Sequence, residues 1–105
     1  MERKMEQNEK RKLLRQLVWD YNISADDIEA VLKGIKDTAG PFTREKLLIR
    51  MLESYPWFTI IQLISIEDIH RLLTRDMISR LRSQSLKEKY EFVRNRLQQI
   101  VSAPG

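Results

Sequence analysis

The sequence predicts an all-α fold, a compact bundle of about six short helices around a buried central helix. Two observations favour this class. Apolar side chains recur at helical spacing in successive segments that short turns separate. One uncharged stretch, residues 55–66, is the most apolar part of a chain that is otherwise dense with charge. The length of 105 residues fits a single domain of this kind.

Residues 55–66 form the predicted central helix. Their polar side chains, Thr59, Gln62 and Ser65, are spaced by three, which on a helix places them in one narrow stripe and leaves the remaining surface apolar. A buried strand is the alternative, because the stretch is rich in β-branched residues. We expect the other helices to pack around this one.

The chain begins with a polar segment, residues 1–12, which has almost no apolar side chain to bury and is expected either to extend from the domain or to form a frayed extension of the first helix. The first helical face starts at Leu13. A second helix is expected to follow Ser24, whose hydroxyl can cap it. Asp26 and Asp27 lie in its first turn, where the helix dipole favours negative charge, so a metal ion is not needed to explain them.

The clearest break in the chain is the Gly40-Pro41 pair. Thr43 follows as the cap of a third helix, which is expected to run to about Ser54. Pro56 ends that helix, because proline lacks a backbone N–H and clashes with the preceding turn. The same proline suits the first turn of the central helix.

Three more helices are expected after the central one, over residues 66–73 and 75–82 and from Ser85 onward, with Thr74 capping the second of them. The last helix has the most regular apolar spacing in the chain, at Leu86, Tyr90, Val93, Leu97 and Ile100. We therefore expect one helical domain over residues 13–101 and a tail over 102–105.

Composition excludes several kinds of active site. The chain has no cysteine, so disulfides, thiolate zinc sites and cysteine nucleophiles are ruled out. The single histidine, His70, has no second histidine with which to share a metal, and no nucleophile can be assigned to it. The glycines do not form a phosphate-binding loop. We expect no enzymatic activity, no catalytic residue, no cofactor and no metal.

The sequence predicts a cytoplasmic protein without a membrane partner. Its N-terminus is charged and lacks the apolar core of a signal peptide. Residues 55–66 are too few to cross a bilayer, which takes about 20 apolar residues in a helix. The formal net charge is +4, with both ends of the chain basic and the middle acidic.

Basic residues crowd into the last third of the chain. They are Arg71, Arg75, Arg80, Arg82, Lys87, Lys89, Arg94 and Arg96. Arginine binds phosphate through a planar fork of donors, so these residues are candidates for contacts to nucleic acid. The other interpretation is a solvated helix face that keeps the protein soluble. The segment around Thr74 leaves almost no turn between two helices, which argues against a helix-turn-helix.

Three aromatic residues, Trp19, Trp57 and Phe92, are candidate anchors for a protein partner. Exposed aromatic side chains often carry much of the binding energy of an interface. The other interpretation is that they belong to the core, and for Trp57 and its neighbour Phe58 the core is the favoured position.

Four segments resemble a family of small uncharacterised bacterial helical proteins. They are the run 17–24, the loop 34–40, the Tyr-Pro-Trp corner at 55–57 and the run 89–94. The resemblance covers most of residues 13–98. Members of this family are often encoded beside nucleotidyltransferase-like toxins, which implies a bacterial protein that partners or neutralises such a nucleotidyltransferase. The resemblance implies no catalytic residue.

Together these observations predict a non-catalytic protein-interaction module, an antitoxin-like or accessory partner of a nucleotidyltransferase. Its main partner would be another protein. The alternative is a nucleic-acid-binding regulator that uses the basic C-terminal helices.

Overall fold

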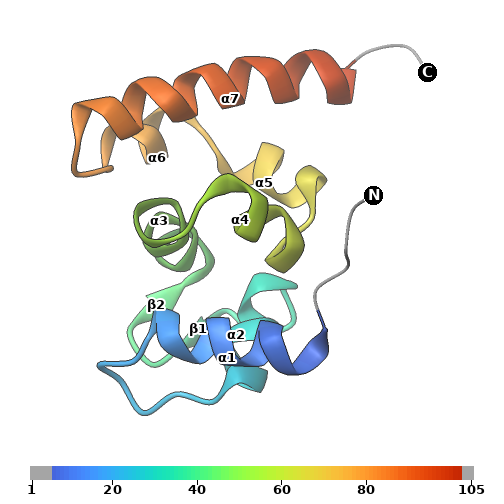
Figure 1. Ribbon diagram of the computed structural model, residues 1–105, viewed down its shortest axis with the longest axis vertical. Helices are drawn as coiled ribbons and strands as arrows, with labels where there is room; N and C mark the ends of the chain where they lie inside the picture. The colour runs from blue at the N-terminus through green and yellow to red at the C-terminus, as the bar shows by residue number, and fades with distance from the viewer. Residues whose placement is uncertain (1–5, 103–105) are drawn as a thin grey trace.

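Seven helices and one short hairpin form the part of the chain that the computed structural model describes, residues 6–102 (Figure 1). The helices are α1 (Gln7–Leu17), α2 (Ala25–Leu32), α3 (Arg44–Ser54), α4 (Trp57–Leu63), α5 (Ile66–Leu72), α6 (Arg75–Ser79) and α7 (Gln84–Ser102). The hairpin pairs β1 (Thr38–Ala39) with β2 (Phe42–Thr43) in antiparallel orientation. The predicted all-α class is confirmed. Residues 1–5 of the expected extension and 103–105 of the expected tail lie outside the described residues.

The helices are arranged along the longest dimension of the molecule, which is 39 Å (Figure 1). α1 and α2 lie with the hairpin at one end, and α3 and α4 lie in the middle. α7 crosses the other end and packs on α5 and α6, whereas α1 packs on α2 and α3. α1 and α7 therefore lie on opposite sides of the core.

Hydroxyl side chains fix the starts of several helices. Each of three predicted caps accepts a hydrogen bond, 3.2 Å long, from the backbone N–H three residues later: Ser24, Thr43 and Thr74. A cap of this kind typically stabilises a helix by about 1 kcal/mol. The expected cap Ser85 is wrong by two residues. Ser83 takes that role, because its hydroxyl accepts from the backbone N–H of Leu86 at 3.1 Å and α7 begins immediately after it.

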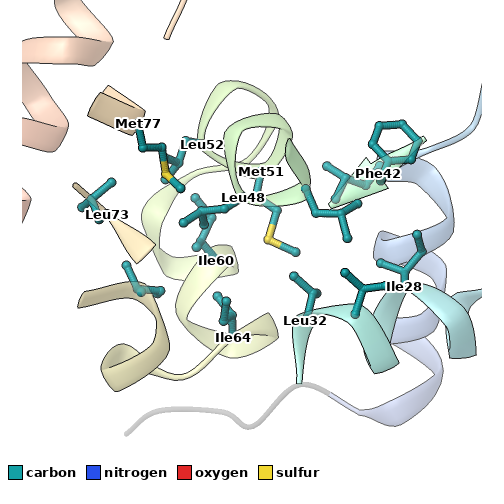
Figure 2. Packing of buried hydrophobic residues seen from close by; sticks show 14 of the residues in the cluster. Ile28, Leu32, Phe42, Leu48, Met51, Leu52, Ile60, Ile64, Leu73 and Met77 are labelled. Atoms are coloured by element: carbon teal, nitrogen blue, oxygen red, sulfur yellow. The ribbon is translucent and has the colours of Figure 1, made fainter. Parts of the chain in front are cut away.

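The prediction that residues 55–66 contain a helix is confirmed, and the alternative of a buried strand is wrong. The prediction that this helix occupies the centre of the core is also wrong. In α4 only Ile60 is fully buried, and Phe58 is 75% exposed. The central position belongs to α3, whose side chains Leu48 and Met51 are completely buried. Figure 2 shows Met51 lying between α4 and α2.

The first helix starts earlier than its apolar pattern indicates. α1 begins at Gln7, so residues 7–12 belong to this helix rather than to a separate extension. Arg11 on this polar turn forms an ion pair with Asp26 in the first turn of α2. The carboxylate that favours the start of α2 therefore also holds the N-terminal half of α1 against it.

The hairpin was not predicted, although it flanks the predicted break. Gly40 has a φ of +58°, a left-handed conformation that glycine adopts without steric penalty. The turn brings Phe42 of β2 into the core and pairs it with Ala39 of β1.

We predict that truncating Met51 destabilises the fold far more than truncating Phe58. Met51→Ala removes a fully buried side chain and should lower the free energy of unfolding by about 2–5 kcal/mol. Phe58→Ala removes an exposed ring and should change it by about 0.5 kcal/mol or less. Urea unfolding followed by circular dichroism measures both values. Equal losses of unfolding free energy for the two variants would indicate that α4 is as central to the core as α3.

Candidate functional site

The three predicted aromatic anchors lie in different environments. Trp19 follows the end of α1 and is 82% exposed, and Phe92 on α7 is 66% exposed. Trp57 is partly buried against the core, with its ring centroid 6.5 Å from that of Tyr90. Phe58, which was expected in the core, points outward instead. Trp19 and Phe92 are therefore available to a partner, and Trp57 serves mainly the packing of α4 against α7.

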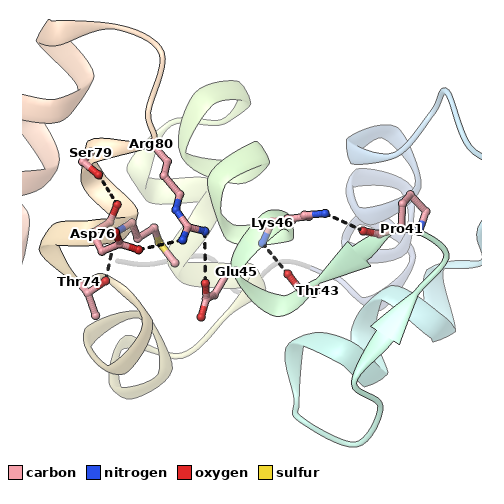
Figure 3. Close-up of polar contacts among 9 residues, drawn as sticks. Pro41, Thr43, Glu45, Lys46, Thr74, Asp76, Ser79 and Arg80 are labelled. Carbon is pink, nitrogen blue, oxygen red and sulfur yellow. Dashed lines mark hydrogen bonds and ion pairs between the residues drawn. The ribbon is translucent and has the colours of Figure 1, made fainter.

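The predicted basic residues of the C-terminal third are largely neutralised by carboxylates. Five of the eight form ion pairs: Arg71 with Asp68, Arg75 and Arg94 with Glu91, Arg80 with Asp76 and Glu45, and Arg82 with Glu53. Figure 3 shows Arg80 reaching both of its carboxylates, at 2.9 Å from Asp76 and 3.7 Å from Glu45. Exposed pairs of this kind are weak, so the arginines stay accessible, but the surface they share has little net charge.

The other three basic residues, Lys87, Lys89 and Arg96, form no ion pair with any described residue. Two of them flank an anchor. Lys89 lies three residues before Phe92 and Arg96 lies four residues after it, a spacing that puts all three side chains on one side of α7. The exposed ring of Phe92 is therefore bordered by Lys89 and Arg96 and, four residues before it, by the carboxylate of Glu88, while the ammonium of Lys89 also lies 5.3 Å from the ring centroid of Tyr90.

A groove beside α1 was missed by the sequence analysis. It runs between α1 and the segment 18–23 and has a volume of about 740 Å³. Six of the side chains that line it are Asn8, Lys12, Arg15, Trp19, Tyr21 and Asn22. The available signal was the basic character of residues 1–16 together with a tryptophan four residues after an arginine. We call this feature the α1 groove.

Arg50 of α3 holds the wall of the α1 groove in place. Its Nη1 donates to the backbone carbonyl of Leu17 at 2.9 Å and to Oδ1 of Asp20 at 2.9 Å, and its Nη2 donates to Oδ2 of Asp20 at 3.1 Å. The guanidinium also lies 4.8 Å from the ring centroid of Phe42 and 5.8 Å from that of Tyr21. The two rings meet edge to face at 4.9 Å. The segment after α1 is thereby fixed to α3 and β2.

Two buried phenols differ in their hydrogen bonding. The hydroxyl of Tyr55 donates to the carbonyl of Leu13 at 2.6 Å and so ties the end of α3 to α1. The hydroxyl of Tyr90, which is fully buried, has no hydrogen-bond partner among the described residues. Burial raises the pKa of both phenols, so both are neutral near pH 7 and neither can act as a base.

The described residues contain no group of three or more histidine, cysteine, aspartate and glutamate side chains that could hold a metal ion. His70, in α5, is partly buried and makes no hydrogen bond to another described side chain. Within the same part of the chain, no helix has the length and apolar character needed to cross a membrane.

Comparison with known proteins does not place this chain in a family, since no protein-family model, no curated protein and no solved structure matches it. The resemblance to small bacterial helical proteins remains a prediction. The surface of this chain is therefore the basis for its proposed function.

We predict that Asp20 makes the fold sensitive to acid. The hydrogen bonds from Arg50 lower the pKa of this carboxyl below its ordinary value of 3.8. Its contribution to stability is therefore fully present above about pH 4 and is lost as the pH falls through the lowered pKa. The difference in unfolding free energy between wild type and Asp20→Asn should be constant from pH 7 to pH 5 and should shrink by pH 3.

Asp37→Asn serves as the control for this experiment, because Asp37 is exposed and forms no ion pair with a described residue. Urea unfolding at each pH supplies the measurement. A wild-type advantage over Asp20→Asn that is unchanged at pH 3 would show that the Arg50 contact does not depend on the charge of Asp20.

We predict opposite outcomes for the same substitution at the two buried tyrosines. Tyr55→Phe removes the hydrogen bond from the phenol to the Leu13 carbonyl and should destabilise the protein by about 1 kcal/mol. Tyr90→Phe removes a hydroxyl that has no partner and should leave the stability unchanged or raise it. Thermal unfolding of the two variants side by side tests this. A clear loss of stability in Tyr90→Phe would mean that its hydroxyl is hydrogen-bonded in solution.

Proposed function

We propose that this protein is a non-catalytic interaction module whose protein partner binds the exposed side of α7. The observation that carries the proposal is the exposure of Phe92, 66% on the side of α7 that faces away from the core. The opposite side of α7 buries Tyr90 and Leu97 against the core. The domain therefore does not need Phe92 for its own packing.

Charge indicates what the partner would present to this surface. Two cations, Lys89 and Arg96, and one carboxylate, Glu88, border Phe92, and the two cations form no ion pair with a described residue. A partner that offers an apolar pocket with acidic residues at its rim would bury the ring and pair both charges. Such an arrangement, with an aromatic anchor inside a polar rim, is typical of protein interfaces.

The resemblance to bacterial proteins encoded beside nucleotidyltransferase-like toxins supports a nucleotidyltransferase as that partner. In this proposal the chain acts in the cytoplasm, as an antitoxin-like or accessory subunit. The non-catalytic role is supported by the absence of cysteine from the sequence and by the isolation of its single histidine from other functional side chains. The alternative, a nucleic-acid-binding regulator that uses the C-terminal arginines, is less well supported because carboxylates pair with most of them.

We predict that a photo-crosslinking amino acid at position 92 captures a protein partner in cells, whereas the same amino acid at position 98 does not. Gln98 is an exposed residue on a different side of α7 and is the matched control. With the captured partner purified, Phe92→Ala should weaken binding by about 30-fold, the effect of losing an anchor worth about 2 kcal/mol. Gln98→Ala should leave the affinity unchanged.

Two results would contradict the proposal. One is crosslinking of equal strength from positions 92 and 98, which would indicate contact without a defined surface. The other is an unchanged affinity in Phe92→Ala, which would move the interface away from α7.

A further inference from the structure

Trp19 lies in the α1 groove and presents an exposed aromatic ring that the core does not use. The neighbouring residues on both sides are anchored, since Val18 is fully buried and Asp20 is bound through both carboxylate oxygens to Arg50. The backbone N–H of Trp19 itself donates to the carbonyl of Gln16 at 3.4 Å. The backbone at Trp19 is held, while its side chain is 82% exposed. A ligand that stacks on the indole would therefore order little additional chain.

The α1 groove carries net positive charge. Three basic side chains line it, and Asp20 is the one carboxylate among the residues that do so. Both oxygens of Asp20 accept hydrogen bonds from Arg50, so its charge is already compensated. Of the three basic residues, Arg11 pairs with Asp26, whereas Lys12 and Arg15 pair with no described residue. Two unpaired cations therefore lie in the same groove as the exposed indole.

The spacing of these side chains matches a ligand with a flat ring and an anionic group. Lys12 and Arg15 are three residues apart on α1, which places them on the same side of the helix, and Trp19 lies in the turn two residues after the end of α1. The volume of the groove, about 740 Å³, lies within the range of about 300–1,000 Å³ for small-molecule sites. A ring on Trp19 would leave the anionic group within reach of both cations.

We propose that the α1 groove binds a nucleoside phosphate unit, with its base stacked on Trp19 and its phosphate bound by Lys12 and Arg15. Stacking on aromatic side chains beside a basic groove is how proteins hold single-stranded nucleic acid, and the same contacts suit a free nucleotide. An acidic peptide would satisfy the cations equally well. It is the less favoured ligand because the exposed indole of Trp19 offers a flat stacking surface that an acidic peptide does not use.

The test follows the fluorescence of Trp19 in a Trp57→Phe background, in which Trp19 is the single tryptophan. The probes are AMP, adenosine, inorganic phosphate, an oligodeoxyadenylate of eight nucleotides and a polyglutamate of eight amino acids. The proposal expects saturable quenching by AMP or by the oligonucleotide, with adenosine and phosphate each at least tenfold weaker. Tighter binding of AMP indicates a free nucleotide as the natural ligand, and tighter binding of the oligonucleotide indicates a single strand.

The matched variants separate a built site from general charge attraction. Lys12→Gln combined with Arg15→Gln should weaken binding at least tenfold. Lys89→Gln combined with Arg96→Gln removes the same charge from α7 and should leave binding unchanged. The association constant for the oligonucleotide should fall with salt. A plot of its logarithm against the logarithm of the salt concentration should have a slope of about −1.4, because each of the two phosphates bound contributes about −0.7.

Four results would overturn the proposal: no quenching by AMP or by the oligonucleotide, equal quenching by polyglutamate, equal losses in the two double variants, or full affinity after Trp19→Leu as measured by filter binding. Circular dichroism of each variant confirms that it is folded. Phe92→Ala should bind nucleotide normally, so the outcome here is independent of the interaction proposed for α7.

Discussion

The arrangement of the N-terminal half depends on one guanidinium. Arg50 projects from α3, the most buried helix, and its planar fork satisfies the Leu17 carbonyl at the end of α1 together with both oxygens of Asp20. Its face lies near the rings of Tyr21 and Phe42 at the same time. A lysine could not make these contacts together, because a point charge lacks both the paired donors and the flat face. The end of α1, the following segment and the hairpin therefore all contact this one side chain.

Features that depend on neighbouring residues could be predicted from the sequence, and those that depend on distant ones could not. The all-α class and the Ser24 cap follow from local spacing and local hydrogen bonds. Burial could not be predicted in this way, because it depends on which helices from elsewhere in the chain pack against a given residue. The stretch 55–66 is the most apolar, yet α4 within it has only seven residues and faces the core mainly through Ile60. α3 is less apolar overall, but α1, α2 and α4 all pack against it.

The candidate site shows the same division. The sequence left Trp19 between an exposed position and a core position, and the partial burial of Trp57 depends on the position of Tyr90 in α7, so neither environment followed from local spacing. The basic residues and the tryptophan of the α1 groove are readable from the sequence, but its shape could not be predicted, because its wall is made by a contact between Asp20 and Arg50, thirty residues apart. Some arginine pairs of the last third are local and readable from the sequence, such as Arg71 with Asp68 and Arg80 with Asp76, whereas the Arg82–Glu53 pair joins residues distant in the sequence.

The two proposed surfaces are independent of each other in electrostatic terms. α1 and α7 lie on opposite sides of a core within a molecule 39 Å long (Figure 1), and the Debye length at physiological ionic strength is only about 8 Å. A charged ligand on α1 would therefore change the potential at Phe92 very little. Any coupling between the surfaces would have to pass through the packed residues of α3, which touches α1 through Arg50 and α6 through the pair of Glu45 with Arg80. Unless α3 moves, the binding free energies of the two surfaces should add.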